Sequence, residues 1–206
     1  MSIFIPLPDH REHVEDEERL VQLCNQYRIG CEDVPHYYDS KRLDQFLSQE
    51  FSKESLFLRT MPDKIILTKP PIFIDVKTTF RKDTGNVSIE LSSFFYTIQR
   101  ASTGLGIYYF YLDENGQPLV FNPKKVAISA IYIQPKWFGN TRMLWEGYAQ
   151  LIMAFCGNVP IIEKATGGSQ DPFVLIPKKS LNAKAIPLYK ALQATGSWGV
   201  VHPGGL

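Results

Sequence analysis

The sequence predicts a mixed α/β (α+β) fold in which helices flank a central sheet. Three observations lead to this prediction. Apolar residues recur at helical spacing near the N-terminus, two short runs rich in β-branched residues follow around residue 70, and a further helix and strand come after them. In a chain of 206 residues this order indicates one layered domain, and it excludes a solenoid or an all-β sandwich.

The N-terminal part is expected to be helical. Val14, Val21 and Cys24 lie at helical spacing within residues 10–27. Acidic residues crowd the early turns of this segment, where the helix dipole favours negative charge. A second helix is expected over residues 40–51, which again carry apolar residues at helical spacing.

The pattern then changes to short strands. Residues 64–67 and 72–76 are apolar and largely β-branched, and Pro70 and Pro71 between them must lie outside a central ladder. These two segments are therefore expected to form an antiparallel pair with a tight connection. A further short run at residues 55–59 predicts one more strand before them.

The remaining elements follow from the same patterns. A polar loop is expected at residues 81–86, and the sequence becomes rich in Gly and Pro after residue 157. The other expected elements are a helix over 91–101, a strand over 107–112 with a hairpin return over 119–121, a strand over 126–133, and helices over 141–155 and 186–192.

Composition excludes several classes of protein. There are 22 Lys and Arg against 21 Asp and Glu, so the chain is neither a polycation nor an acidic tail, although a basic groove on a neutral protein can still bind nucleic acid. No apolar run approaches the roughly 18 residues of a membrane span, and the N-terminus lacks the features of a signal peptide. The three Cys include no CxxC pair, which argues against a zinc site and a disulfide framework and favours a reducing, cytoplasmic location.

One segment concentrates residues that could carry chemistry. Asp63 opens the first strand of the expected pair, and Asp75 lies at the end of the second. Lys77 is two residues further on, so it projects from the same face of the strand as Asp75. Two converging carboxylates repel each other unless a cation lies between them, and Mg²⁺ prefers carboxylate oxygens. A lysine beside such an ion can orient a water molecule and stabilise charge on a phosphate.

Pro62-Asp63, followed by Asp75-Val76-Lys77, resembles the PD-(D/E)xK motif of the restriction-endonuclease-like nuclease superfamily. The resemblance covers about residues 10–115 and implies a restriction-endonuclease-like mixed central sheet flanked by helices. It further implies a Mg²⁺-dependent (or Mn²⁺-dependent) endonuclease that hydrolyses DNA. In that reading Asp63 and Asp75 hold the metal, Lys77 serves the attacking water, and two copies pair as a homodimer.

The same resemblance implies a further acid from the first helix. The segment from Glu17 to Leu23 is similar to the start of archaeal Holliday-junction resolvases, which assigns Glu17 to the metal. Glu50 is the competing choice, because the expected helix over residues 40–51 lies closer to the motif. Residues 116–206 form a C-terminal extension of the single domain, and its sequence resembles no family that identifies its role.

Several basic and polar residues near the motif could contact DNA, since phosphate neutralisation dominates nucleic-acid affinity. Exposure to solvent without a ligand explains the three basic residues equally well. The role of the neutral Gln99 is implied only by the resemblance, in which a polar residue often follows the motif on the next helix, and an ordinary helix-surface position explains it better. The residues that could contact DNA are Arg81, Lys82, Gln99 and Arg100.

Three other interpretations remain open. Asp75 and Lys77 could form a surface ion pair of little energetic value. The chain could be a nuclease fold without catalysis that binds DNA or protein. It could also be an assembly protein of a virus or mobile element in which the motif is accidental.

Overall fold

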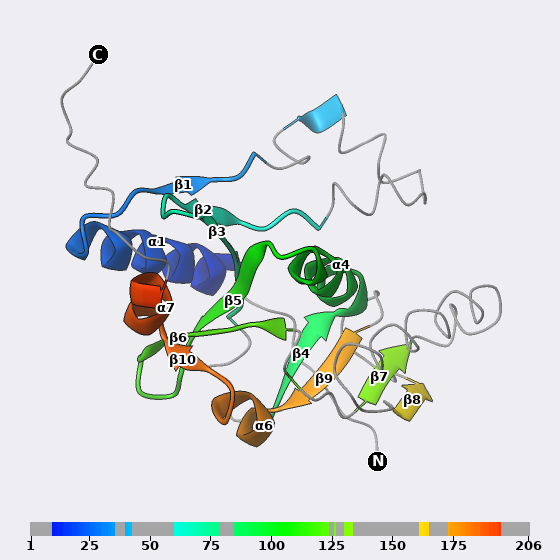
Figure 1. Ribbon diagram of the computed structural model, residues 1–206. Coiled ribbons are helices and arrows are strands. Elements are labelled where there is room, and N and C mark those ends of the chain that lie inside the picture. The colour runs from blue at the N-terminus through cyan, green and yellow to red at the C-terminus, as the bar shows by residue number, and fades with distance from the viewer. Residues whose placement is uncertain are drawn as a thin grey trace.

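The computed structural model has a mixed α/β fold with a mostly antiparallel sheet flanked by helices (Figure 1). The fold class predicted from the sequence is confirmed at this level. No helix among the described residues is long and apolar enough to cross a membrane. The structure describes residues 10–35, 40–42, 60–78, 85–123, 126, 130–133, 161–164 and 173–194.

The first helix, α1 (His10–Gln26), confirms the helix expected over residues 10–27. Its buried stripe is formed by Leu20, Leu23 and Cys24, whereas Val14 is 41% exposed. The helix ends with Arg28 in the left-handed region at φ 57°, and Ile29 N donates to Cys24 O at 3.0 Å. This closure satisfies a terminal carbonyl and turns the chain back along the helix.

Strand β1 (Cys31–Asp33) follows at once and was not predicted, because three residues give almost no periodic signal. It pairs antiparallel with β2 (Lys64–Ile66), which in turn pairs antiparallel with β3 (Ile72–Val76). The antiparallel pair expected from residues 64–67 and 72–76 is therefore confirmed. The predicted strand over 55–59 lies outside the described residues, as does nearly all of the predicted helix over 40–51.

The chain then crosses over the sheet. Strand β4 (Asn86–Glu90) leads into α4 (Leu91–Ser102), and β5 (Gly106–Leu112) pairs parallel with β3. Strand β6 (Pro118–Phe121) returns antiparallel beside β5. The helix expected over 91–101 and the hairpin expected from 107–112 and 119–121 are thus confirmed.

The C-terminal part completes the first sheet and builds a second. In the first sheet β10 (Ile186–Pro187) pairs with β6, giving the order β1-β2-β3-β5-β6-β10. In the second sheet the order is β4-β9-β7-β8, with only β7 and β8 parallel. Its other strands are β7 (Ala130–Ile133), β8 (Ile161–Lys164) and β9 (Phe173–Pro177).

Several predictions about this part need correction. The strand expected over 126–133 is present as β7 over residues 130–133, whereas Val126 is not in a strand and residues 127–129 lie outside the described residues. The short helix expected over 186–192 is α7 (Leu188–Ala194), preceded by β10. Strands β4, β8 and β9 and the short helix α6 (Lys178–Asn182) were missed. The predicted helix over 141–155 lies outside the described residues.

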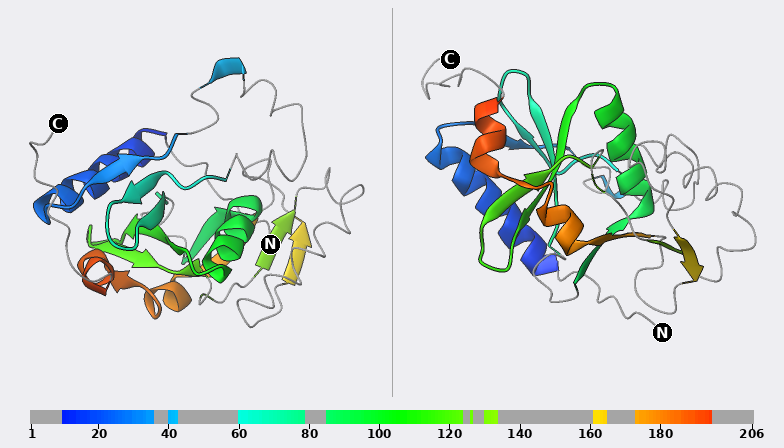
Figure 2. Two further views of the ribbon diagram at one scale, coloured as in Figure 1. Left: turned by 45° about the horizontal axis from the view of Figure 1, so that its top comes forward. Right: turned by 60° about the horizontal axis from the view of Figure 1, so that its bottom comes forward.

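Each face of the first sheet is covered by a separate apolar core (Figures 1 and 2). Alternate residues of β5 enter alternate cores, as the two-residue period of a strand requires. Phe110 and Leu112 enter the core beneath α1 and α7, whereas Tyr109 and Tyr111 enter the core beneath α4, β4 and β9. The core beneath α1 and α7 fixes α1 on the sheet through Leu20, which is fully buried.

We expect Leu20→Ala to lower the free energy of unfolding by about 2–5 kcal/mol, because it removes a fully buried side chain and leaves a cavity beneath α1. Denaturant titration followed by circular dichroism measures this change. Val14→Ala on the same helix is the matched control and should change stability by no more than about 0.5 kcal/mol, because Val14 is largely exposed. Equal effects of the two substitutions would contradict the packing described for α1.

Candidate metal centre

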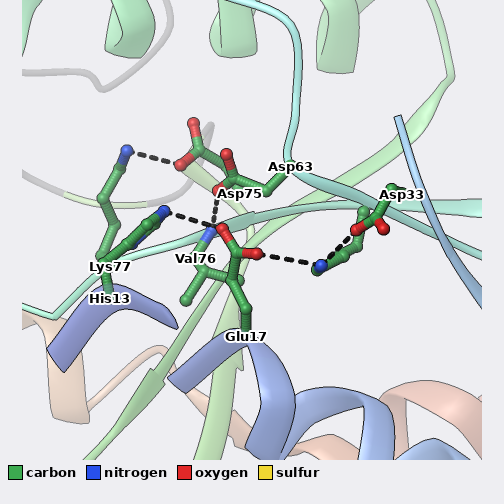
Figure 3. Close-up of polar contacts among 8 residues, drawn as sticks. His13, Glu17, Asp33, Asp63, Asp75, Val76 and Lys77 are labelled. Atoms are coloured by element: carbon green, nitrogen blue, oxygen red, sulfur yellow. Dashed lines mark hydrogen bonds and ion pairs between the residues drawn. The ribbon is translucent and has the colours of Figure 1, made fainter. Parts of the chain in front are cut away.

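One end of the β2–β3 pair brings the two predicted aspartates together. Asp63 comes directly before β2, and Asp75 lies within β3. Lys64 is paired with Ile74 in the antiparallel register, so Asp63 and Asp75 occupy the next two facing positions. Figure 3 shows their carboxylates side by side.

Asp75 is buried and has a partner at each carboxylate oxygen. Its Oδ1 lies 2.5 Å from Lys77 Nζ, and its Oδ2 accepts a hydrogen bond of 3.0 Å from Ser93 Oγ of α4. The side chain of Asp75 is 7% exposed, so this is a buried ion pair and not the surface pair that the sequence left open. Asp75 and Lys77 do share a face of the strand, as the spacing predicts.

Lys77 combines a charged end with a partly open position. Its Nζ lies 5.6 Å from the centroid of the buried Tyr109 ring, and its side chain is 24% exposed. Burial acts to lower the pKa of Lys77, but Asp75 and Asp63 outweigh it and raise that pKa well above its usual value. Lys77 is therefore a cation throughout the physiological pH range.

Asp63 is partly buried and lies directly before the first residue of β2. Its Oδ2 accepts a hydrogen bond of 2.6 Å from the backbone N–H of Val76. Burial and the neighbouring charge of Asp75 raise the pKa of Asp63 to about 7, against the opposing effects of Lys77 and the Val76 N–H. Without a bound metal ion, the ionisation of both neighbouring aspartates is therefore unfavourable.

Helix α1 reaches Asp63 from the face of the first sheet opposite to the face that α4 covers. His13 and Glu17 lie one helical turn apart, and His13 Nε2 is 2.8 Å from Glu17 Oε1. Ligand atoms of His13, Glu17 and Asp63 all lie within 4.8 Å of one another. Glu17 is thus placed beside Asp63 as the resemblance implied, whereas the competing Glu50 lies outside the described residues.

The second oxygen of Glu17 is also bound. Glu17 Oε2 lies 2.9 Å from Lys64 Nζ, and the same amine contacts Asp33 of β1. Burial acts to raise the pKa of Glu17, but the hydrogen bonds from His13 and Lys64 outweigh it and lower that pKa to about 2. The hydrogen bond to Glu17 raises the pKa of His13 despite its burial.

The clustered atoms suit a divalent cation with mixed ligands. Carboxylate oxygens are the ligands of Mg²⁺ and Mn²⁺, and an imidazole nitrogen favours Mn²⁺ or another transition metal over Mg²⁺. His13 was missed in the sequence, although its place four residues before Glu17 on one helix face was a usable signal. Asp75 lies next to this cluster but is not one of its three members, so its predicted role as a metal ligand stays a prediction.

Two of the four predicted DNA-contacting residues, Gln99 and Arg100, are described, and both lie on α4. Arg100 is partly buried; its Nη1 donates to Thr60 O at 2.5 Å, and its guanidinium lies 5.9 Å from the Tyr96 ring centroid. Gln99 is exposed on α4. Arg81 and Lys82 lie outside the described residues.

We expect Asp63→Asn to stabilise the metal-free protein increasingly as the pH rises from about 4 to 7. The pKa of Asp63 is raised on folding, so ionisation favours the unfolded state across this interval, and the cost is complete above it. The gain in the free energy of unfolding should reach roughly 2 kcal/mol at pH 8. This is less than the full pKa shift implies at about 1.4 kcal/mol per pKa unit, because solvent partly screens the site.

Urea titrations in the presence of a chelator measure this difference. Glu32→Gln on exposed β1 is the matched control and should show no such trend. Parallel stability curves for Asp63→Asn and the unmodified chain would contradict the proximity of the two aspartates.

Comparison with known proteins yields no relative. No family model, no curated protein and no solved structure matches this chain. The functional argument therefore depends on the geometry of His13, Glu17, Asp63, Asp75 and Lys77.

Proposed function

We propose that this protein is a metal-dependent phosphodiester hydrolase that cuts DNA internally. The convergence of Asp63, Asp75 and Lys77 at one end of two adjacent strands carries this proposal. Glu17 and His13 add two further ligand atoms beside Asp63 from α1. DNA as the substrate comes from the resemblance to the PD-(D/E)xK nucleases, as does the pairing of two copies.

The order of elements supports the resemblance. The chain runs through α1, β1, β2, β3, α4 and β5, which is the order expected for the family, with β4 added before α4. Asp63 precedes the second strand of this series and Asp75 lies in the third, where the motif requires them. Among the described residues, the strand that precedes the motif in the sheet is β1, which pairs with β2.

Glu17, Asp63 and His13 would hold the metal, with Asp75 beside them. A divalent ion bound there would polarise the phosphate and lower the pKa of a water molecule. The Val76 N–H orients Asp63 through its hydrogen bond to Oδ2. Asp75 holds the Lys77 amine at 2.5 Å and Ser93 fixes the remaining oxygen of Asp75.

The charge of Lys77 limits the part that it plays. An amine whose pKa is raised stays protonated, so Lys77 donates hydrogen bonds and cannot act as the general base. It can align the attacking water and stabilise the negative charge that develops on the phosphate. Its partial exposure allows this contact, whereas the buried Asp75 serves to position it.

We expect Asp63→Asn and Lys77→Met each to lower the rate of DNA cleavage at least about 100-fold, because one removes a metal-binding charge and the other the cation that faces the phosphate. Supercoiled, linear, branched and single-stranded DNA are incubated with Mg²⁺ or Mn²⁺, and the products are separated on gels. Glu32→Gln is the control, and it should cut at the unmodified rate. If Asp75→Ala, Asp63→Asn and the unmodified chain cut equally, the assignment fails.

One observation favours a second candidate, a nuclease fold that binds DNA or protein without cutting. Protein cations already contact Asp75 and Glu17, so the described carboxylates have partners without a metal. Calorimetric titration with Mn²⁺ separates the two candidates. Binding that is lost in both Asp63→Asn and Glu17→Gln supports the hydrolase, and the absence of any such binding supports the module.

A further inference from the structure

Lys64 joins three elements at the edge of the candidate site. It is the first residue of β2, directly after Asp63, and its side chain is only 8% exposed. Its Nζ lies 2.9 Å from Glu17 Oε2 of α1 and also contacts Asp33 Oδ1 of β1. Figure 3 shows this series of contacts running from Asp33 to Glu17 and on to His13.

The Lys64 amine is buried, and its positive charge is paired with two carboxylates. A buried ammonium is costly unless it is paired, and here two carboxylates share it. Asp33 is 80% exposed, so its own charge keeps its hydration while it pairs with Lys64. The two carboxylate contacts, from α1 and from β1, fix the Lys64 amine between Glu17 and Asp33.

This contact determines how Glu17 faces the cluster. Lys64 binds Oε2, and Oε1 is the oxygen that lies 2.8 Å from His13 Nε2. Without the amine, a side chain that is 23% exposed could rotate away from His13 and Asp63. We propose that Lys64 is a positioning residue that holds Glu17 in place to bind a divalent cation. The inference rests on the proposed function, since it assumes that the cluster takes a metal.

The groups around the cluster are mostly carboxylates. Among the described residues, Glu17, Asp33, Asp63 and Asp75 gather there with the two ammonium groups of Lys64 and Lys77, and a bound divalent cation would favour the ionised form of all four carboxylates. A direct role for Lys64 on the phosphate of a substrate is excluded by its burial and by its two carboxylate partners.

The test measures Mn²⁺ binding to the full chain by calorimetry. We expect Lys64→Met, which keeps the length of the side chain, to weaken Mn²⁺ affinity about 10–100-fold, as loss of a residue that orients a metal ligand typically does. Lys64→Gln, which retains a hydrogen-bond donor for Glu17, should weaken it less. Lys184→Met replaces an exposed lysine and should leave Mn²⁺ affinity unchanged.

Cleavage kinetics add a readout that a purely structural role would not move. In Lys64→Met, the Mn²⁺ concentration for half-maximal cleavage should rise about 10–100-fold, while kcat at saturating Mn²⁺ stays within about threefold of the unmodified rate. In a Glu17→Gln background, Lys64→Met should add no further loss of Mn²⁺ affinity, because its effect passes through Glu17.

The outcomes separate the two proposals. Unchanged Mn²⁺ affinity in both Lys64 variants overturns the positioning role while the metal site stands. Absence of Mn²⁺ binding to the unmodified chain overturns the metal site and this inference with it. If Lys64→Met fails to fold, the comparison of Lys64→Gln with the unmodified chain decides the question.

Discussion

The candidate site depends on the electrostatic repulsion between two aspartates that the β2–β3 register holds side by side. Backbone pairing fixes Asp63 and Asp75 at facing positions, so their carboxylates cannot separate without breaking the sheet. Lys77 neutralises one of them, and burial keeps the other from ionising easily. The pairing thus creates a point at which a bound cation would favour the ionisation of Asp63 beside Asp75.

Helices α1 and α4 contact the two aspartates from opposite faces of the sheet. From the α4 side, Ser93 and the Tyr109 ring fix the Asp75–Lys77 pair. From the α1 side, His13 and Glu17 reach the edge at Asp63. Because each helix is anchored in its own apolar core, the two halves of the site are positioned independently and meet only at the strand ends.

The parts of the site that were predictable from the sequence are those with local signals. Asp63, Asp75 and Lys77 stand within 15 residues on two recognisable strands, and their i, i+2 and strand-end positions determine which way they point. The roles of Lys64 and Asp33 had no such signal, because the strand that brings Asp33 to Lys64 is three residues long and pairs with residues 31 to 35 positions away. The position of His13 four residues before Glu17 was a usable signal, but it stands within a charged run that favours interpretation as an exposed helix face.

The fold shows the same division. Helices α1 and α4 and the β2–β3 and β5–β6 hairpins were predicted because their patterns are complete within one segment. Strand β9 was missed within a segment rich in Gly and Pro, although all of Phe173, Val174, Leu175 and Ile176 are buried. A strand buried on both faces lacks alternation, and its partner β4 is more than 80 residues away in the chain.

The outermost described strands of the first sheet have a consequence for how copies of this chain can associate. Strand β1 presents the exposed acids Glu32 and Asp33, and β10 is two residues long and contains Pro187, which has no N–H to donate. Charge and proline are the usual means of blocking strand addition at a sheet margin. A continuous intermolecular ladder is therefore disfavoured at both of these margins of the first sheet.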